Sequence, residues 1–272
     1  MNVSKIKPVI IQGGEPFYYP GNEVGILLIH GFTDSPLEMQ PFGKYLNEKG
    51  YSVLGMRTTG HATSIDDLKR SRWKDLLASV EDGYALLKSN QNIKKIIIIG
   101  HSMGGAMTLI AGSYLDVDGL IVLAPGYKLS APLPLLEYFN AFKVYWGSLK
   151  RKWKSRNIPN RLPGWYWYKP ELSRGYIKYN EKPLICNLQL VHLANLVPEI
   201  LPGITCPILL MGARRDSILD PNSLDEVFSL LGSQEKEILW FEKSSHMLPV
   251  DGERDLVFEK SYDFIERAIL NK

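Results

Sequence analysis

Cysteine is scarce in this chain, which has only Cys186 and Cys206 among its 272 residues. Two cysteines without a C-x-x-C spacing exclude a disulfide framework, a cysteine-rich zinc site and a dithiol redox motif, so we expect both to be free thiols. Long apolar runs are missing as well. The strongest block, residues 94–100, is far shorter than a bilayer crossing, and the first residues contain no apolar run of signal-peptide length. We therefore expect a soluble cytoplasmic protein.

Neither sign of charge dominates, since 32 Lys and Arg stand against 29 Asp and Glu and leave a net charge of +3. Composition alone therefore does not indicate a protein that binds polyanions. With 45% apolar and 22% charged residues, the chain is too apolar for disorder and long enough for one large α/β domain or two small ones. No internal repeat of about 20 to 50 residues is visible, which excludes solenoids and propellers.

Strand-like and helix-like segments alternate through most of the chain. Continuous apolar runs are typical of parallel strands buried on both faces, and the helical segments carry apolar residues at helical spacing. Strands are expected at 25–32, 51–57, 95–100, 119–125, 206–213 and 236–241, after a short β pair at 7–12 and 16–23, and helices at 35–49, 71–88, 103–115, 222–231 and 254–270. This order predicts a mostly parallel central sheet with helices on both faces.

The alternation stops at Gly126 and resumes after Gly203. Residues 126–203 hold twelve Lys and Arg, four Asp and Glu, and thirteen of the 29 aromatic residues, so they carry +8 and the rest carries −5. We interpret 126–203 as a helical cap inserted into a core made of 1–125 and 204–272. For its basic run at 148–156 a solvated cationic face is favoured over contact with an anionic lipid surface, and both over nucleic acid, because the rest of the molecule is acidic.

One short motif points to a chemical reaction. Residues 100–105 read GHSMGG, a G-x-S-x-G pattern between a predicted buried strand and a predicted helix. Such an elbow presents its serine at a sharp turn, and glycines flank it because a side chain there would collide with the tight backbone. This context favours Ser102 as a nucleophile over a glycine-rich turn that merely joins strand to helix.

A serine nucleophile needs a base, and the base needs an acid that orients it, in the chain order serine, acid, histidine for this architecture. Two histidines follow Ser102. His192 lies in a predicted helix, where a packing role fits better, whereas His246 lies in a loop after the last strand and is the expected base. Asp216 and Asp220 compete as the acid. Asp216 is favoured because it is nearer the carboxyl end of its strand, while Asp220 precedes a proline and is typical of a turn.

The tetrahedral intermediate of such a reaction also needs an anion site. Gly31 lets the backbone turn so that the Phe32 amide can face the serine, and the Met103 amide, directly after the serine, is the expected second donor. His30 and His61 flank turns and are expected to be structural. Neither a phosphate-binding glycine loop nor a metal-binding histidine spacing occurs, so we expect no cofactor, no metal and no nucleotide.

These motifs resemble the α/β-hydrolase superfamily, in particular its small bacterial carboxylesterases and monoacylglycerol lipases. The matching segments are HGFTDSP (30–36), GH (60–61), WKD (73–75), GHSMGG (100–105), GARRD (212–216) and SSH (244–246). The resemblance extends over nearly the whole chain outside the insertion. The resemblance implies the α/β-hydrolase fold, a triad of Ser102, Asp216 and His246, an oxyanion hole of the Phe32 and Met103 amides, and a lid formed by the insertion.

Two features depart from the family pattern: GHA stands at 60–62 where GHG is frequent, and the insertion is longer, more basic and more aromatic than the usual lid. The resemblance implies a small-molecule ester substrate, such as a monoacylglycerol or another fatty-acid monoester, cleaved through an acyl-enzyme. An esterase of short-chain or aryl esters, an amidase or a thioesterase would share every catalytic residue. A non-catalytic binding relative is disfavoured because it needs no complete triad. Acyl length, alcohol and oligomeric state stay open.

Overall fold

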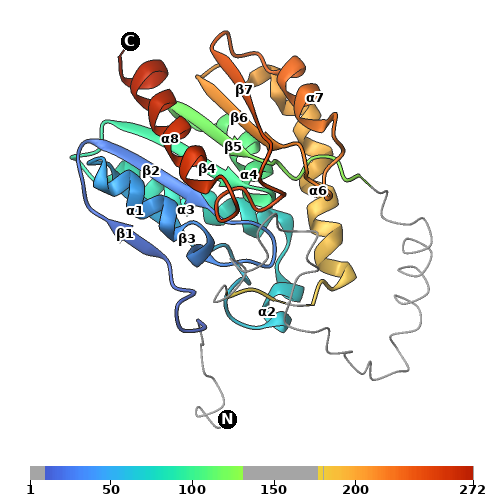
Figure 1. Cartoon of the computed structure of the whole chain (residues 1–272). Helices are drawn as coiled ribbons and strands as arrows, with labels where there is room; N and C mark the ends of the chain where they lie inside the picture. The colour runs from blue at the N-terminus through green and yellow to red at the C-terminus, as the bar shows by residue number, and fades with distance from the viewer. Residues whose placement is uncertain (1–9, 131–176, 180, 272) are drawn as a thin grey trace, which may run out of the picture.

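The computed structural model describes residues 10–130, 177–179 and 181–271. Its centre is a seven-stranded sheet in the order β1-β3-β2-β4-β5-β6-β7, in which only β1 runs antiparallel to its neighbour (Figure 1). The strands are β1 (Phe17–Tyr19), β2 (Val24–Ile29), β3 (Ser52–Met56), β4 (Lys95–His101), β5 (Gly119–Leu123), β6 (Ile208–Ala213) and β7 (Lys236–Phe241). The prediction of a mostly parallel sheet is confirmed.

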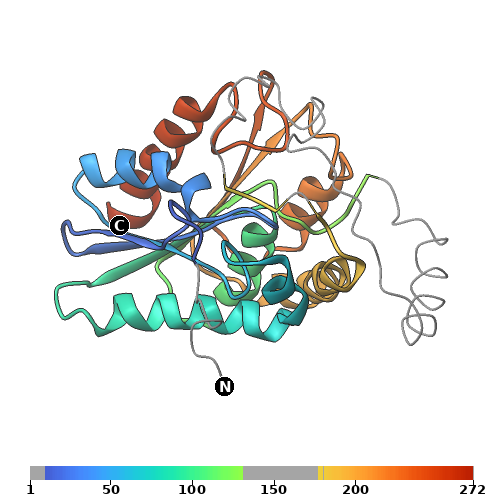
Figure 2. The same cartoon turned by 90° about the horizontal axis from the view of Figure 1, so that it is seen from below.

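Helices cover both faces of this sheet, as expected. Figure 2 shows the sheet between the two helix layers, with α1 and α8 on one side and α3, α4 and α6 on the other. The helices are α1 (Gln40–Glu48), α2 (Ile65–Arg70), α3 (Trp73–Ser89), α4 (Met103–Gly112), α6 (Leu184–Ile200), α7 (Ser223–Leu230) and α8 (Arg254–Phe264), the last continued by a π-helical stretch at Ile265–Leu270.

Strand β4 explains why the central strands are apolar along their whole length. Successive side chains of a strand point to opposite faces of the sheet. Ile96 and Ile98 accordingly pack among the residues of α3 and α4, whereas Ile97 and Ile99 pack among those of α1 and α8. A strand between two helix layers must be apolar at every position, which is the pattern that the sequence has.

The expected β pair at the start of the chain is wrong. Strand β1 forms, but it pairs with β3 and not with a preceding strand. Residues 10–12 form no strand, and residues 7–9 lie outside the described residues. Ile11 instead donates a backbone hydrogen bond to Ala62, 2.8 Å away. The open edge of β3 offers β1 a full ladder, and that non-local pairing prevails over a local hairpin.

Helix α6 precedes β6, and its Leu193 and Val197 are buried in the core cluster that also contains residues of α3 and α4. Within the described residues, Leu184–Gly203 is the one helical segment long and apolar enough to cross a membrane by length and composition. Residues 131–176 of the expected cap, including the basic run at 148–156, lie outside the described residues. The division into core and cap stays a prediction.

Candidate active site

Ser102 stands at the turn from β4 into α4 with a positive φ of 53° and a ψ of −113°. A residue with a Cβ rarely adopts this conformation, because it crowds the neighbouring backbone. Two hydrogen bonds hold it against β5 and the loop after that strand. The Ser102 amide donates to the Leu123 carbonyl at 2.9 Å, and the Ser102 carbonyl accepts from the Gly126 amide at 2.8 Å. The serine is therefore fixed against the end of β5 in a strained, outward-facing turn.

The glycines around Ser102 allow the backbone to pack closely. A Cβ at position 100 would lie 2.2 Å from the Gly104 carbonyl oxygen, and a Cβ at position 104 would lie 2.3 Å from the Ile29 carbonyl oxygen. Real Cβ atoms do not approach oxygen this closely. The start of α4 thus rests directly on the end of β2, which brings Ser102 beside the loop that follows β2.

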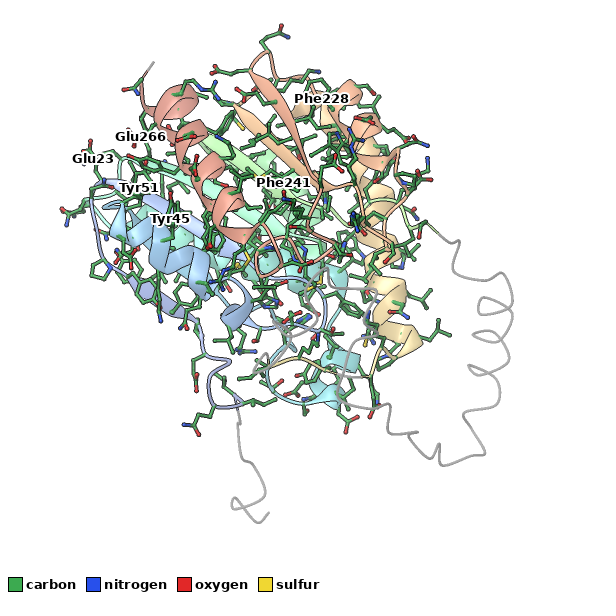
Figure 3. All side chains as sticks on the ribbon, viewed as in Figure 1. Glu23, Tyr45, Tyr51, Phe228, Phe241 and Glu266 are labelled. Carbon is green, nitrogen blue, oxygen red and sulfur yellow. The ribbon has the colours of Figure 1, made fainter. Side chains whose placement is uncertain are left out.

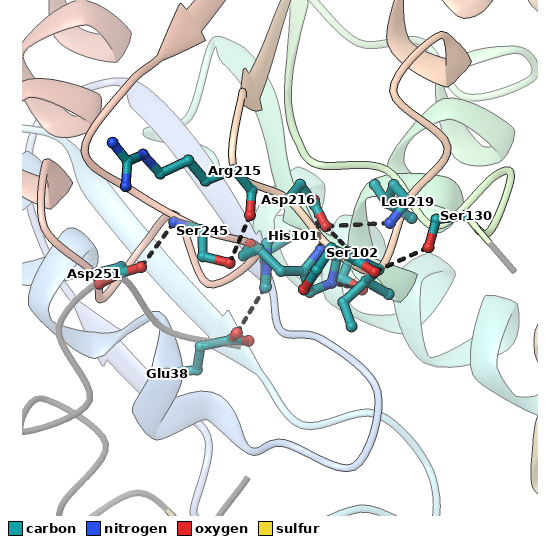
Figure 4. A network of polar contacts seen from close by, with 12 residues as sticks. Glu38, His101, Ser102, Ser130, Arg215, Asp216, Leu219, Ser245 and Asp251 are labelled. Carbon is teal, nitrogen blue, oxygen red and sulfur yellow. Dashed lines mark hydrogen bonds and ion pairs between the residues drawn. The ribbon is translucent and has the colours of Figure 1, made fainter. Parts of the chain in front are cut away.

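Three side chains from different loops meet in one chain of hydrogen bonds. The Ser102 Oγ lies 2.9 Å from Nε2 of His246, and Nδ1 of His246 lies 2.8 Å from Oδ2 of Asp216 (Figure 4). A carboxylate can only accept, so Nδ1 carries the proton and Nε2 offers its lone pair to the serine hydroxyl. This is the arrangement in which imidazole can remove the serine proton.

Backbone amides fix the carboxylate of Asp216. Its Oδ1 accepts hydrogen bonds from the amides of Ile218 and Leu219, at 2.8 and 3.1 Å (Figure 4). Burial acts to raise the pKa of Asp216, but His246 and these two amides outweigh it and lower the pKa below its ordinary value of 3.8. The carboxylate therefore stays ionised at neutral pH and can stabilise a cationic imidazole.

The alternative acid, Asp220, and the alternative base, His192, lie away from Ser102. The Asp220 carboxylate accepts a hydrogen bond of 2.8 Å from the Asn222 amide, within the turn that leads into α7. His192 is exposed on α6, and its ring stacks on Trp73 at 6.5 Å between centroids. The structure thus brings Asp216 and His246 to Ser102 and leaves Asp220 and His192 away from it.

The two amides expected to bind an oxyanion, those of Phe32 and Met103, have no hydrogen-bond acceptor among the described residues. The loop that carries Phe32 is held on both sides. The Gly31 amide donates to Oε2 of Glu38 at 2.6 Å, and the Thr33 carbonyl accepts from the Tyr179 amide at 2.8 Å. Two donors at the ends of β2 and β4 are thus available to a bound ligand.

The comparison with known proteins decides the family. The model of the family described as serine aminopeptidase, S33, matches residues 22–253. The chain belongs to this family. It is therefore a serine hydrolase with the α/β-hydrolase fold, and the resemblance found in the sequence is confirmed.

Proteins similar to this serine hydrolase match it over nearly the whole length of both chains. A thermostable monoacylglycerol lipase of Bacillus sp. (strain H-257) is 29% identical over 259 residues, covering 95% of this chain and 96% of the relative. A carboxylesterase of Bacillus subtilis (strain 168) is 27% identical over 254 residues, covering 93% and 96%. A solved structure from work on LipS and LipT, two metagenome-derived lipolytic enzymes, superposes with a TM-score of 0.79 at 26% identity, covering 95% of this chain and all of that one.

Two further histidines tie the loop after β2 of the hydrolase to the loop after β3. Both His30 and His61 are fully buried, and the Thr58 hydroxyl lies 3.1 Å from His30 Nε2 and 2.8 Å from His61 Nδ1. Burial lowers the pKa of both rings, so they are neutral at physiological pH. The Nε2 of His61 has no partner among the residues that the structure describes. These contacts agree with a structural role for both.

Sequence reasoning missed a buried acid–imidazole pair behind Ser102. Nδ1 of His101 lies 2.6 Å from Oε1 of Glu38, and Nε2 of His101 lies 2.8 Å from the carbonyl oxygen of His246. His101 is conspicuous in the sequence only as the neighbour of Ser102. Glu38 carries no sequence signal, because its partner is 63 positions away.

No group of three or more His, Cys, Asp or Glu residues in the described part of the chain is arranged to hold a metal ion. Cys186 and Cys206 are free thiols, as expected. Burial raises the pKa of each thiol to about 11, so both are protonated at neutral pH and poor nucleophiles.

Proposed function

We propose that the protein is a carboxylic ester hydrolase that cleaves monoacylglycerols or similar fatty-acid monoesters through an acyl-enzyme. The observation that carries the proposal is the unbroken hydrogen-bond chain from Ser102 through His246 to Asp216, at a strained strand-to-helix turn. Such a chain activates a hydroxyl that is otherwise too weak a nucleophile at neutral pH.

The proposed reaction has two halves. In the first, Oγ of Ser102 attacks the ester carbonyl carbon while its proton passes to Nε2 of His246, and the carbonyl oxygen becomes an oxyanion held by the Phe32 and Met103 amides. The intermediate then collapses: the C–O bond to the alcohol breaks, and His246 gives the proton to the departing alcohol. In the second half, water gives a proton to His246 as its oxygen attacks the acyl carbon. The C–Oγ bond then breaks, His246 returns the proton to Oγ, and the acid leaves with Ser102 restored. Asp216 stabilises the imidazolium in both halves.

The relatives support a fatty-acid monoester as the substrate. One is named as a monoacylglycerol lipase and one as a carboxylesterase, each over more than nine-tenths of both chains. The thirteen aromatic residues within 126–203 would suit the walls of an apolar acyl tunnel. We propose that this segment, 126–203, forms a cap, and that α6 anchors it to the core through Leu193 and Val197.

A substrate panel tests the proposal. We expect turnover of p-nitrophenyl esters whose kcat/KM rises with chain length, turnover of monoacylglycerols, and little turnover of triacylglycerol, because one acyl chain fills a tunnel and three do not. The assay compares these esters with matching anilides and thioesters at equal chain length. Preference for anilides or thioesters would contradict an ester hydrolase, and preference for the shortest acyl chain would favour the short-chain esterase instead.

A transient contact with anionic lipid is the alternative to the solvated cationic face that the sequence favours for the basic segment, in a protein that we propose is cytoplasmic. The net charge of +8 on residues 126–203 predicts that the protein co-sediments with vesicles containing anionic lipid, and less so as salt rises, because salt screens charges beyond about 10 Å at 0.1 M. Neutral vesicles are the control. Equally weak co-sedimentation with anionic and neutral vesicles, by protein that still hydrolyses monoacylglycerols, would contradict this contact.

A further inference from the structure

Glu38 and His101 form an acid–imidazole pair that water cannot reach, since their side chains are 0% and 1% exposed. Burying two ionisable groups is costly unless each is fully hydrogen-bonded. In this pair each group is fully hydrogen-bonded. Oε1 of Glu38 faces Nδ1 of His101 at 2.6 Å, Oε2 accepts from the Gly31 amide at 2.6 Å, and Nε2 of His101 faces the His246 carbonyl at 2.8 Å.

The partners define where the protons are. With Glu38 ionised, the two partners of the His101 ring are a carboxylate and a carbonyl, which can only accept, so both ring nitrogens donate and the ring is an imidazolium. The pKa shifts of His101 and Glu38 agree with this assignment of the protons. Burial acts to lower the pKa of His101, but Glu38 outweighs it and raises the pKa; conversely, His101 lowers the pKa of Glu38 against its burial. Asp34, a second buried carboxyl nearby, has a pKa raised by burial and by Glu38, so Glu38 is the carboxyl that ionises first.

The pair is linked to three parts of the proposed site: the oxyanion loop, the loop of the base and the turn of the nucleophile. Glu38 holds the amide of Gly31, one residue before the proposed oxyanion donor Phe32. His101 holds the carbonyl of His246, the proposed base, and is itself one residue before Ser102. Figure 4 shows the contact between Glu38 and His101, with His101 beside Ser102. The three parts come from loops that are far apart in the sequence, and this pair is a direct link between them.

We propose that Glu38 and His101 are positioning residues, which hold the oxyanion loop and the loop of the base at the separation that acylation of Ser102 requires. The inference rests on the proposed function. It commits to the hydrogen-bonded connection, rather than the charge of the pair, as the feature that supports the rate. Losing such a connection moves donors by a fraction of an ångström, which weakens transition-state contacts more than substrate binding.

Three variants separate the effect of the hydrogen-bonded connection from the effect of the charge of the pair. Glu38→Leu fills the space but removes both bonds of the carboxylate, and we expect kcat to fall about 100-fold with KM changed less than about twofold. His101→Asn places an amide nitrogen where Nδ1 was, keeps the contact with Glu38 and loses only the one to His246, so kcat should fall about tenfold. Glu38→Gln can accept from Gly31 and donate to a neutral His101 ring, so it should recover most of the rate lost in Glu38→Leu.

Tyr51→Phe is the matched control for stability alone. It removes the partly buried contact between Tyr51 and Glu266, whose side chains lie beside α8 in Figure 3. Tyr51 immediately precedes β3, at the end of the sheet opposite the active site. We expect this variant to lower the melting temperature and to leave kcat unchanged. Rates are normalised to active sites by titration with a fluorophosphonate, so that unfolded protein does not count.

Each result bears on the proposal. Glu38→Leu and His101→Asn that lose stability like Tyr51→Phe but keep the wild-type kcat would overturn it and leave a purely structural pair. Glu38→Gln as slow as Glu38→Leu would overturn it as well, because charge would then matter and the connection would not. If Glu38→Leu does not fold, the other two variants decide. A slow His101→Asn beside a nearly wild-type Glu38→Gln supports the proposal, and a wild-type kcat in His101→Asn overturns it. Wild-type protein that neither hydrolyses esters nor reacts with the fluorophosphonate would contradict the proposed function instead.

Discussion

Replacing Ser102 by alanine should lower kcat for ester hydrolysis by about 10⁶-fold, because the attacking atom and the proton that His246 accepts are both removed. What remains should be the weak catalysis that an oxyanion site and substrate binding supply without a nucleophile. Fold and stability should be retained, since the smaller side chain fits a turn held by backbone hydrogen bonds to Leu123 and Gly126. Steady-state kinetics and thermal unfolding of the same preparation measure both.

Ser113→Ala is the matched control for this change. Ser113 follows the last residue of α4, the helix that begins directly after Ser102, and its hydroxyl donates to the Ile110 carbonyl at 2.7 Å. We expect a small loss of stability and an unchanged kcat. Turnover by Ser102→Ala within about tenfold of the wild type would remove Ser102 from the mechanism.

Asp216→Asn should lower kcat by about 10⁴-fold, the size of effect known for the acid of other triads. The asparagine amide can keep the bonds from Ile218 and Leu219 at its oxygen, but it turns a donor toward Nδ1 of His246. The imidazole then loses its proton at Nδ1, takes the wrong tautomer for accepting the serine proton, and has no anion to stabilise its cation. KM should change little, because Asp216 does not contact the substrate.

Asp220→Asn is the control for the acid. Its carboxylate bonds only the Asn222 amide among the side-chain contacts of the described residues, and an asparagine oxygen can replace that bond. We expect kcat within about twofold of the wild type. The opposite ranking, with Asp220→Asn crippled and Asp216→Asn mild, would show that the acid was assigned to the wrong residue.

The central fold could be predicted from the sequence because its signals are local. Four successive isoleucines in β4 indicate a strand buried on both faces, and the glycines of GHSMGG indicate a tight turn into a helix. The partner of β1 could not be predicted, because the choice between a hairpin and the edge of β3 depends on strands more than 30 positions away. The packing of α6 beside α3 and α4 could not be predicted either, because a break in the strand–helix alternation shows where an insertion begins and not which helices it contacts.

The proposed triad could be predicted because chain order and position after a strand restrict the candidates. His246 follows the last strand, and Asp216 lies nearer than Asp220 to the carboxyl end of β6. Glu38 gave no such signal. A glutamate at the start of a helix is usually solvated, and only the three-dimensional approach of His101 and Gly31 makes it a buried partner.

Mapping the residue that reacts with a fluorophosphonate tests the central claim most directly. The reagent phosphonylates a serine whose proton is removed by a neighbouring base, so wild-type protein should take up one equivalent, and peptide mass spectrometry should locate it on Ser102. Asp216→Asn should react much more slowly at the same residue, and Ser102→Ala should not react. An adduct on any other residue, or equal labelling of Ser102→Ala and the wild type, would contradict the account.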